Sequence, residues 1–193
     1  MPEYVNFTSR IDISPPLNAS ESVYLTRFAD TRRMARLSGP YTTLSTGRLV
    51  LPDGDIIDIN QPPQGQPGLR CQWVPTESGT GIEWSRRSKF PFAAEWMAYL
   101  IRKFLKPDAE LARELHSPLP GRYYAPEFPD FTFDHTLSGH IEALGEAGDP
   151  WRIVVEDNRV SVTEQGLKRP VGWARPARSA NVARPESTSI SGT

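Results

Sequence analysis

Apolar and polar residues follow two different periods along the chain, and the clearest helical period covers residues 92–105. Apolar side chains recur there at the spacing of one buried helix face. Pro91 suits the first helical position, and Pro107 ends the pattern. We therefore expect this helix to form the centre of the core. Its expected core side chains are Trp96, Met97, Leu100, Ile101, Phe104 and Leu105.

A period of two residues marks two strands, at residues 5–13 and 131–142. Such alternation predicts strands with one face on the core and the other in solvent. Gly139 interrupts the second apolar row and indicates a bulge or a close backbone approach. A helix follows the first strand, because Asn18 and Glu21 have the spacing of a capping box.

Two hairpins and one short helix complete the expected elements. The first hairpin joins residues 71–74 to residues 81–84 through a turn that contains proline and glycine. The second joins residues 151–156 to residues 159–164 through Asp157-Asn158, a short turn. Residues 108–115 fit the short helix.

The order strand, helix, hairpin, helix, strand is that of a ferredoxin-like βαββαβ layer. We predict an α+β fold: an antiparallel sheet with helices on one face and an added C-terminal β-hairpin. Residues 1–164 form a single domain, in which residues 38–66 are a long loop with one short hairpin near residues 49–57. Residues 165–193 are expected to be a disordered basic tail, because they lack apolar periodicity and carry five basic residues and one acidic residue.

Several stretches together resemble a known family. The central stretch reads QPGL-x-CQWVPTE-x-GT-x-IEW, then KF, then EW-x-x-YLI-x-x-FL. The opening, with ISPPLNASE and YLTRFADTRRMAR-x-x-GPY, and the later run DPWRIVVEDNRV fit the same pattern. Over residues 5–162 the chain resembles an uncharacterised family of small proteins from actinobacteria and their phages. The resemblance implies such an origin and carries over no catalytic residue. Two departures are Ser85-Arg86-Arg87-Ser88, in place of an acidic glycine-containing turn, and the continuation after the last strand.

Composition excludes several classes of protein. The formal net charge of -1 gives the whole molecule no field that would attract nucleic acid or membrane. No segment approaches the length of a transmembrane helix, and the start is not a signal peptide. Cys71 is the single cysteine, which excludes an internal disulfide, fits a reducing compartment and suits a buried strand position. We expect a cytoplasmic protein (in the host cytosol if phage-encoded) with no membrane contact and no cofactor.

The polar face of the predicted sheet carries the residues that suggest catalysis. His140 and Glu142 lie on the same side of their strand, and Arg10 or Asp12 can join them. General acid–base catalysis also needs a pocket and a partner within hydrogen-bond reach. An enzyme that uses His140 and Glu142 is therefore an alternative, and we assign no catalytic residue. His135, on the apolar face, is expected to be structural.

Two polar clusters have simpler structural explanations. An aspartate group lacks the spacing of a calcium loop, so we expect no metal site: Asp53, Asp55 and Asp58. Four arginines can in principle hold phosphate, but a solvated helix face with local partners explains them better: Arg27, Arg32, Arg33 and Arg36.

The first hairpin has a basic, aromatic edge, and tryptophan and arginine dominate protein–protein hot spots. We interpret the chain as a non-catalytic accessory or regulatory protein that binds a protein partner. The alternative is a nucleic-acid-associated regulator that uses Arg86, Arg87 and the basic tail, with an affinity that falls steeply with salt. The candidate binding residues are Arg70, Trp73, Arg86, Arg87 and Lys89 at the hairpin, and Arg10, His140 and Glu142 on the sheet face.

Overall fold

The computed structural model describes residues 5–45, 48–49, 52–87, 89–145 and 150–171. The main sheet in these residues consists of β1 (Asn6–Thr8), β2 (Ile11–Ser14), β7 (Trp73–Pro75), β8 (Gly81–Trp84), β9 (Thr136–Leu144), β10 (Pro150–Glu156), β11 (Arg159–Glu164) and β12 (Leu167–Pro170). The strand order is β12-β11-β10-β9-β2-β8-β7, and β1 pairs with β9 beside this path. All of these pairings are antiparallel.

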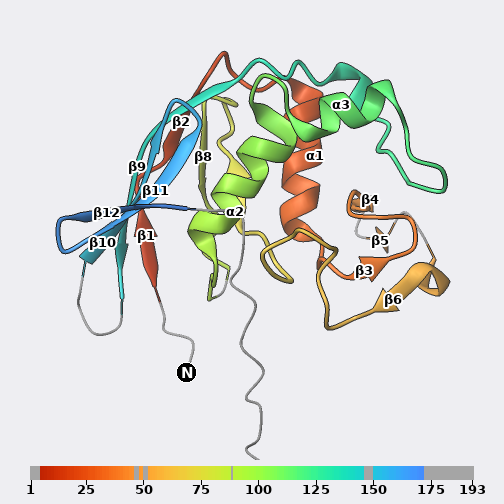
Figure 1. The fold of residues 1–193 in the computed structure, drawn as a ribbon, viewed down its shortest axis with the longest axis horizontal. Helices are drawn as coiled ribbons and strands as arrows, with labels where there is room; N and C mark the ends of the chain where they lie inside the picture. The colour runs from red at the N-terminus through yellow and green to blue at the C-terminus, as the bar shows by residue number, and fades with distance from the viewer. Residues whose placement is uncertain (1–4, 46–47, 50–51, 88, 146–149, 172–193) are drawn as a thin grey trace, which may run out of the picture.

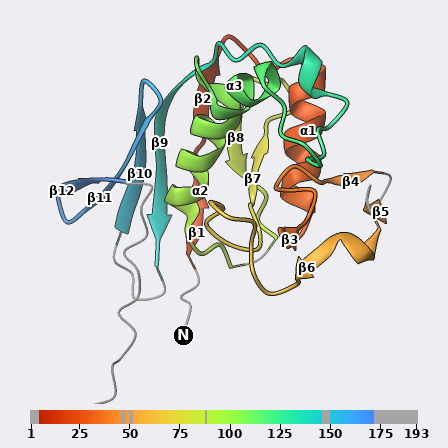
Figure 2. The same cartoon turned by 45° about the vertical axis from the view of Figure 1, so that its right-hand side comes forward.

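Helices α1 (Ala19–Asp30) and α2 (Ala93–Leu100) lie on the same side of the sheet (Figure 1 and Figure 2). The capping box of α1 is confirmed, since Asn18 and Glu21 each accept the other's backbone N–H with a side-chain oxygen. α2 begins two residues after Pro91, because Phe92 has a left-handed backbone with φ 61°. The mixed α+β class with an antiparallel sheet is confirmed.

The expected core face of the second helix is confirmed over its whole length. α2 continues as a π-helical turn, η2 (Ile101–Leu105), and α3 (Glu110–His116) follows where a short helix is predicted. All the expected core side chains of this helix are at most 2% exposed. Phe28 of α1 meets them edge to face, with ring centres 6.0 Å from Trp96 and 5.4 Å from Phe104. The two helices therefore share one aromatic core above the sheet.

Two strands are shorter than the alternation predicts. The first is divided at Ser9, whose left-handed backbone (φ 72°) separates β1 from β2, and both parts pair with β9. The long strand begins at Thr136, because Phe133 is also left-handed (φ 51°) and interrupts the ladder. Phe131 nevertheless remains buried, after the short turn η3 (Phe128–Asp130).

The predicted loop at residues 38–66 contains short strands, one of which pairs with a strand just before the loop. The pairs are β3 (Ala35–Arg36) with β6 (Ile56–Asp58), and β4 (Leu44–Ser45) with β5 (Arg48–Leu49). The predicted hairpin near residues 49–57 is therefore wrong, since its arms pair with different strands. Asp55, in the turn η1 (Asp53–Asp55), helps to hold β6 against β3. Its carboxylate accepts both the N–H and the hydroxyl of Ser38, which follows β3.

The C-terminal hairpin is confirmed, with Asp157 and Asn158 left-handed at its turn (φ 47° and 68°). The chain turns again at Gln165 and Gly166 and pairs β12 with β11, so the predicted start of the disordered tail at Gln165 is wrong. The rest of that tail, residues 172–193, lies outside the described residues. Two of its basic residues belong to β12 and form ion pairs across the sheet: Lys168 with Glu156, and Arg169 with Glu164.

Candidate functional site

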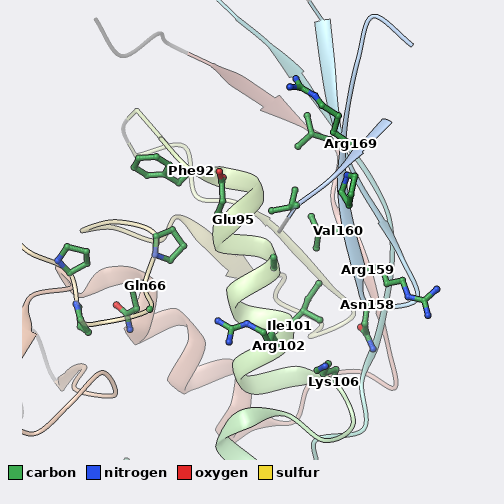
Figure 3. Close-up of a pocket in the computed structure, with 18 of the residues that line it drawn as sticks. Gln66, Phe92, Glu95, Ile101, Arg102, Lys106, Asn158, Arg159, Val160 and Arg169 are labelled. Atoms are coloured by element: carbon green, nitrogen blue, oxygen red, sulfur yellow. The ribbon is translucent and has the colours of Figure 1, made fainter. Parts of the chain in front are cut away.

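A groove of about 1020 Å³ runs beside α2, and we call it the α2 groove (Figure 3). Its walls come from three distant segments: residues 62–67, the outward side of α2 and η2, and residues 158–171. Apolar side chains such as Pro63, Ala98 and Val162 make much of its surface. A hollow of this size with apolar walls and a few polar groups is typical of a binding site.

One end of the α2 groove is basic, and the backbone of His135 holds that end together. The His135 N–H donates to the carbonyl of Leu105 (3.1 Å), and Lys106 follows directly. The His135 carbonyl accepts the side-chain amide of Asn158 (3.0 Å), and Arg159 follows directly. One residue thus fixes both the helix end and the hairpin turn at this end of the groove, where Lys106 lies near the strands and the Arg159 side chain points away from α2 (Figure 3).

The charges of the α2 groove are unevenly matched. Within the described ranges, Lys106 forms no ion pair, whereas Arg159 lies opposite Glu156 across the hairpin. Arg102 forms an ion pair with Glu110. Glu95 lies toward the other end of the groove (Figure 3). Cations that stand beside apolar surface without a counter-ion favour an anionic ligand at that end.

The π-helical turn η2 shapes the helical wall. The Lys106 N–H donates to the Ile101 carbonyl at 3.0 Å, which is the five-residue spacing of a π-helix. Phe104 and Leu105 stay in the core, while Arg102 and Lys106 line the groove. Because π-turns are rare and frequent at functional sites, this irregularity supports a functional role for the groove.

A buried ion pair lies behind the basic end. The side chains of Glu21 and His135 are each 1% exposed, with 3.1 Å between Oε1 and Nε2, and His135 Nδ1 donates to the Pro15 carbonyl (2.8 Å). Burial alone lowers the pKa of His135, but the bonds to Glu21 and Pro15 outweigh it and hold that pKa above its ordinary value. Burial alone raises the pKa of Glu21, but the hydrogen bonds from His135, Thr132 and Asn18 hold it below its ordinary value. The structural role expected for His135 is confirmed.

The wall at residues 62–67 is fixed by Gln66, which is 5% exposed. Its amide oxygen accepts from Arg33 (3.2 Å), and its NH₂ donates to the Tyr99 hydroxyl (3.0 Å). Arg33 also donates to the Thr42 carbonyl (2.7 Å) and is 2% exposed. The predicted solvated arginine face is therefore wrong at Arg33 and at Arg36, which is 7% exposed, because both side chains tie loop carbonyls to the body of the protein.

The structure places none of the residues predicted for binding in the α2 groove. Trp73 is 1% exposed and donates its indole N–H to the Ala93 carbonyl (2.7 Å), so the prediction that it presents a binding surface is wrong. Arg86 and Arg87 line a separate hollow of about 430 Å³, and Arg87 is ion-paired with Asp30. Lys89 lines a hollow of about 310 Å³ at the start of α2, and Arg70 is exposed.

The outer face of the sheet carries the other predicted residues. His140 Nε2 lies 3.6 Å from Glu142 Oε1, and Arg152 Nε lies 2.7 Å from the same oxygen. Arg10 is paired with Asp12 at 3.0 Å. These side chains are partly or fully exposed, only His140 and Arg152 among them line a shallow depression, and Glu142 is already held by Arg152. This arrangement gives an acid–base pair no enclosed position for a substrate.

Other candidate chemistry finds a structural explanation. In the described part of the chain, no group of three or more histidine, cysteine, aspartate or glutamate residues is arranged to hold a metal ion. Burial raises the pKa of the Cys71 thiol to about 12, so it is a poor nucleophile at neutral pH. Among the described helices, none combines the length and the apolar composition that crossing a membrane requires.

Sequence reasoning missed the α2 groove because its walls meet only in three dimensions. One feature of the sequence could have indicated the groove. Arg102 and Lys106, at the basic end of the second helix, lie on the same helix face as the small Ala98. Comparisons with known proteins do not test the family resemblance, which therefore stays a prediction. No protein-family model, no curated protein and no solved structure matches the chain.

Proposed function

We propose that the protein is a non-catalytic accessory or regulatory protein, and that its α2 groove receives a segment of a protein partner. The observation that carries this proposal is the apolar groove that ends at Lys106, a cation without an ion pair in the described ranges. Apolar walls supply the affinity for such a segment, and the charged end supplies its specificity.

The extent of the groove favours a peptide segment over a compact small molecule. A second hollow of about 310 Å³ shares Phe92, Glu95 and Val162 with the α2 groove, so the depression continues past the start of α2. Helical and extended segments commonly bind in long apolar grooves of this kind. Catalysis by His140 is less well supported, because Glu142 is already paired with Arg152 on an exposed face.

We also propose a ferredoxin-like core, a cytosolic location and an actinobacterial or phage origin. The strand order β9-β2-β8-β7, with α1 and α2 as the connections, supports the ferredoxin-like layout, and β10, β11 and β12 extend it. The buried single cysteine supports the location, and the quoted motifs support the origin.

The test is recovery of a partner from actinobacterial lysate with the full chain, at low and moderate salt. Filling the groove with Ala98→Trp is expected to abolish recovery of a protein that wild type retains in salt. Val154→Trp, on the outer sheet face, is the matched control and is expected to retain it. Ala98→Leu gives a milder filling if the larger variant loses its circular dichroism spectrum. Equal recovery by all variants contradicts the proposal, and recovery of nucleic acid that salt removes favours the nucleic-acid regulator.

A further inference from the structure

We infer that the indole N–H of Trp96 binds a backbone carbonyl of the segment in the α2 groove, and that the Phe92 ring covers this donor until the segment arrives. The inference rests on the proposed function and deepens it, because it names the group that the groove offers to a peptide. The end of the groove concerned is the one opposite Lys106, where Phe92 and Glu95 lie (Figure 3).

The Trp96 indole N–H is a buried donor without an acceptor. Trp96 is 0% exposed, and within the described ranges its Nε1 has no hydrogen-bond partner. A buried polar group without a partner costs free energy, and nearly all such groups in proteins are paired. Trp73 shows the ordinary case, since its buried indole N–H donates to the Ala93 carbonyl at 2.7 Å. The Trp96 donor is therefore available to an acceptor from another molecule.

This donor lies next to the groove wall. A Cβ atom placed on Gly68 would be 3.8 Å from Trp96 Nε1 and 3.4 Å from Cδ2 of Phe92, so the indole N–H and the Phe92 ring meet at this glycine. Gly68 directly follows Pro67, and both Pro67 and Phe92 line the groove. A segment that runs along this wall therefore passes close to the unpaired donor.

Phe92 has the properties of a movable cover. Its large apolar side chain is 41% exposed, and its backbone is left-handed (φ 61°, ψ 32°), a conformation that residues other than glycine rarely adopt. Strained backbone of this kind is concentrated at ligand sites. The Trp96 indole is fixed by contrast, with ring centres 6.0 Å from Phe28 and 5.5 Å from Tyr99. Displacement of the Phe92 ring alone thus uncovers the donor.

The chemistry of this end favours a peptide carbonyl as the acceptor. An indole N–H only donates, so its partner must be an acceptor. Glu95 lines the same end and would repel a carboxylate, whereas a neutral carbonyl meets no such penalty. A hydrogen bond among apolar walls is also stronger than one in water. An apolar side chain of the segment takes the place of the Phe92 ring, and the neighbouring backbone carbonyl accepts from Trp96.

The test selects random short peptides displayed on phage with the full chain, and uses the best binder as a synthetic probe. Trp96→Phe removes the donor and keeps an aromatic ring, so it should bind the probe about tenfold more weakly by calorimetry, the scale of one hydrogen bond. Trp73→Phe is the matched control, because it deletes the same atoms and also breaks a hydrogen bond inside the protein. It should lower the urea midpoint more than Trp96→Phe does and leave the affinity for the probe unchanged.

Two further measurements do not depend on the folding of either tryptophan variant. In wild type, the indole N–H proton resonance of Trp96 should move downfield when the probe binds. Phe92→Gly removes the cover and suits the left-handed backbone, so it should bind the probe severalfold more tightly than wild type.

The outcomes separate this inference from the proposed function. A probe that shifts backbone amides of the α2 groove but leaves the Trp96 indole resonance unmoved overturns this inference alone. Equal affinity of Trp96→Phe and wild type has the same meaning, and weaker binding by Phe92→Gly overturns the role of Phe92 as a cover. Failure of every enriched peptide to shift groove amides overturns the proposed function as well.

Discussion

The α2 groove and the outer face of the sheet both carry charged side chains, but the two surfaces satisfy them differently. On the outer face Arg152 lies opposite Glu142 on the neighbouring strand, and the pair is 2.7 Å apart. In the groove, Lys106 stands beside apolar walls and has no such neighbour in the described ranges. Cross-strand pairs of opposite charge stabilise the sheet that carries them. An unpaired cation in a groove does not, and so its natural role is toward a ligand.

Two histidine–glutamate pairs, one buried and one on the outer face, differ in the same way. His135 and Glu21 are each 1% exposed at 3.1 Å, whereas His140 and Glu142 are 57% and 35% exposed at 3.6 Å. The residue types are the same, but the first pair is buried and closer, and Glu142 in the second also pairs with Arg152. We therefore expect the first pair to control stability and the second to contribute little.

The largest expected effect comes from breaking the buried pair. His135→Ala leaves the Glu21 carboxylate buried without its cation and should cost about 3–5 kcal/mol of the free energy of unfolding. His140→Ala, the matched change on the outer face, should stay within about 0.5 kcal/mol. Urea denaturation followed by circular dichroism measures both. Equal losses of unfolding free energy in the two variants would contradict the distinction between the buried and the exposed pair.

A substitution in the groove wall at residues 62–67 should lower the free energy of unfolding by less. Gln66→Ala removes one hydrogen-bond partner of Arg33 and one of Tyr99 and should cost about 2 kcal/mol, the scale of losing buried hydrogen bonds, one of them to a charged group. Gln64→Ala changes an exposed glutamine in the same loop and should be nearly neutral. Thermal unfolding of both variants tests whether Gln66 holds this wall.

The pH dependence of stability should carry the signature of the buried pair. The raised pKa of His135 means that its contribution is complete below its ordinary value of 6.5 and is lost as pH rises through the raised value. The lowered pKa of Glu21 means that its contribution is complete above the ordinary value of 4.5 and is lost as pH falls through the lowered value. Stability from this pair should therefore be greatest between pH 4.5 and 6.5. Denaturation curves across pH should show this window in His140→Ala and lose it in His135→Ala.

The smallest effect is expected on the outer face itself. Glu142→Gln removes the carboxylate that pairs with Arg152, and the loss should not exceed about 0.5 kcal/mol because solvent screens the pair. Added salt should reduce even this difference. A loss several times larger, measured by urea denaturation at low salt, would show that the outer face is not the simple solvated surface that its exposure indicates.

Local patterns were sufficient to predict the second helix, its core face, the capping box of α1 and both hairpins. Each of these depends on residues close together in sequence, such as Asn18 and Glu21 or Asp157 and Asn158. Left-handed residues such as Ser9 and Phe133 ended strands that hydrophobic alternation alone extends. Nothing in the residue type distinguishes these positions.

The α2 groove was beyond such patterns because no single segment contains it. Its basic end depends on the backbone of His135, which holds Leu105 and Asn158 by hydrogen bonds, and these contacts depend on tertiary packing. Trp73 shows the reverse problem, since a tryptophan near arginines suits a binding surface equally well until its burial is known. Sequence chemistry identifies what a residue can do, and packing decides whether it is accessible.

Strand β12 couples binding in the α2 groove to the docking of an edge strand on the sheet. This strand is the edge of the sheet, yet its residues Arg169 and Pro170, with Val171 directly after them, form part of one groove wall. A segment bound against that wall selects the state in which β12 is docked on β11. Docking and binding are therefore reciprocal, and each must favour the other by the same factor. A change in the outward side chains of β12 can thus tune affinity without touching the bound segment.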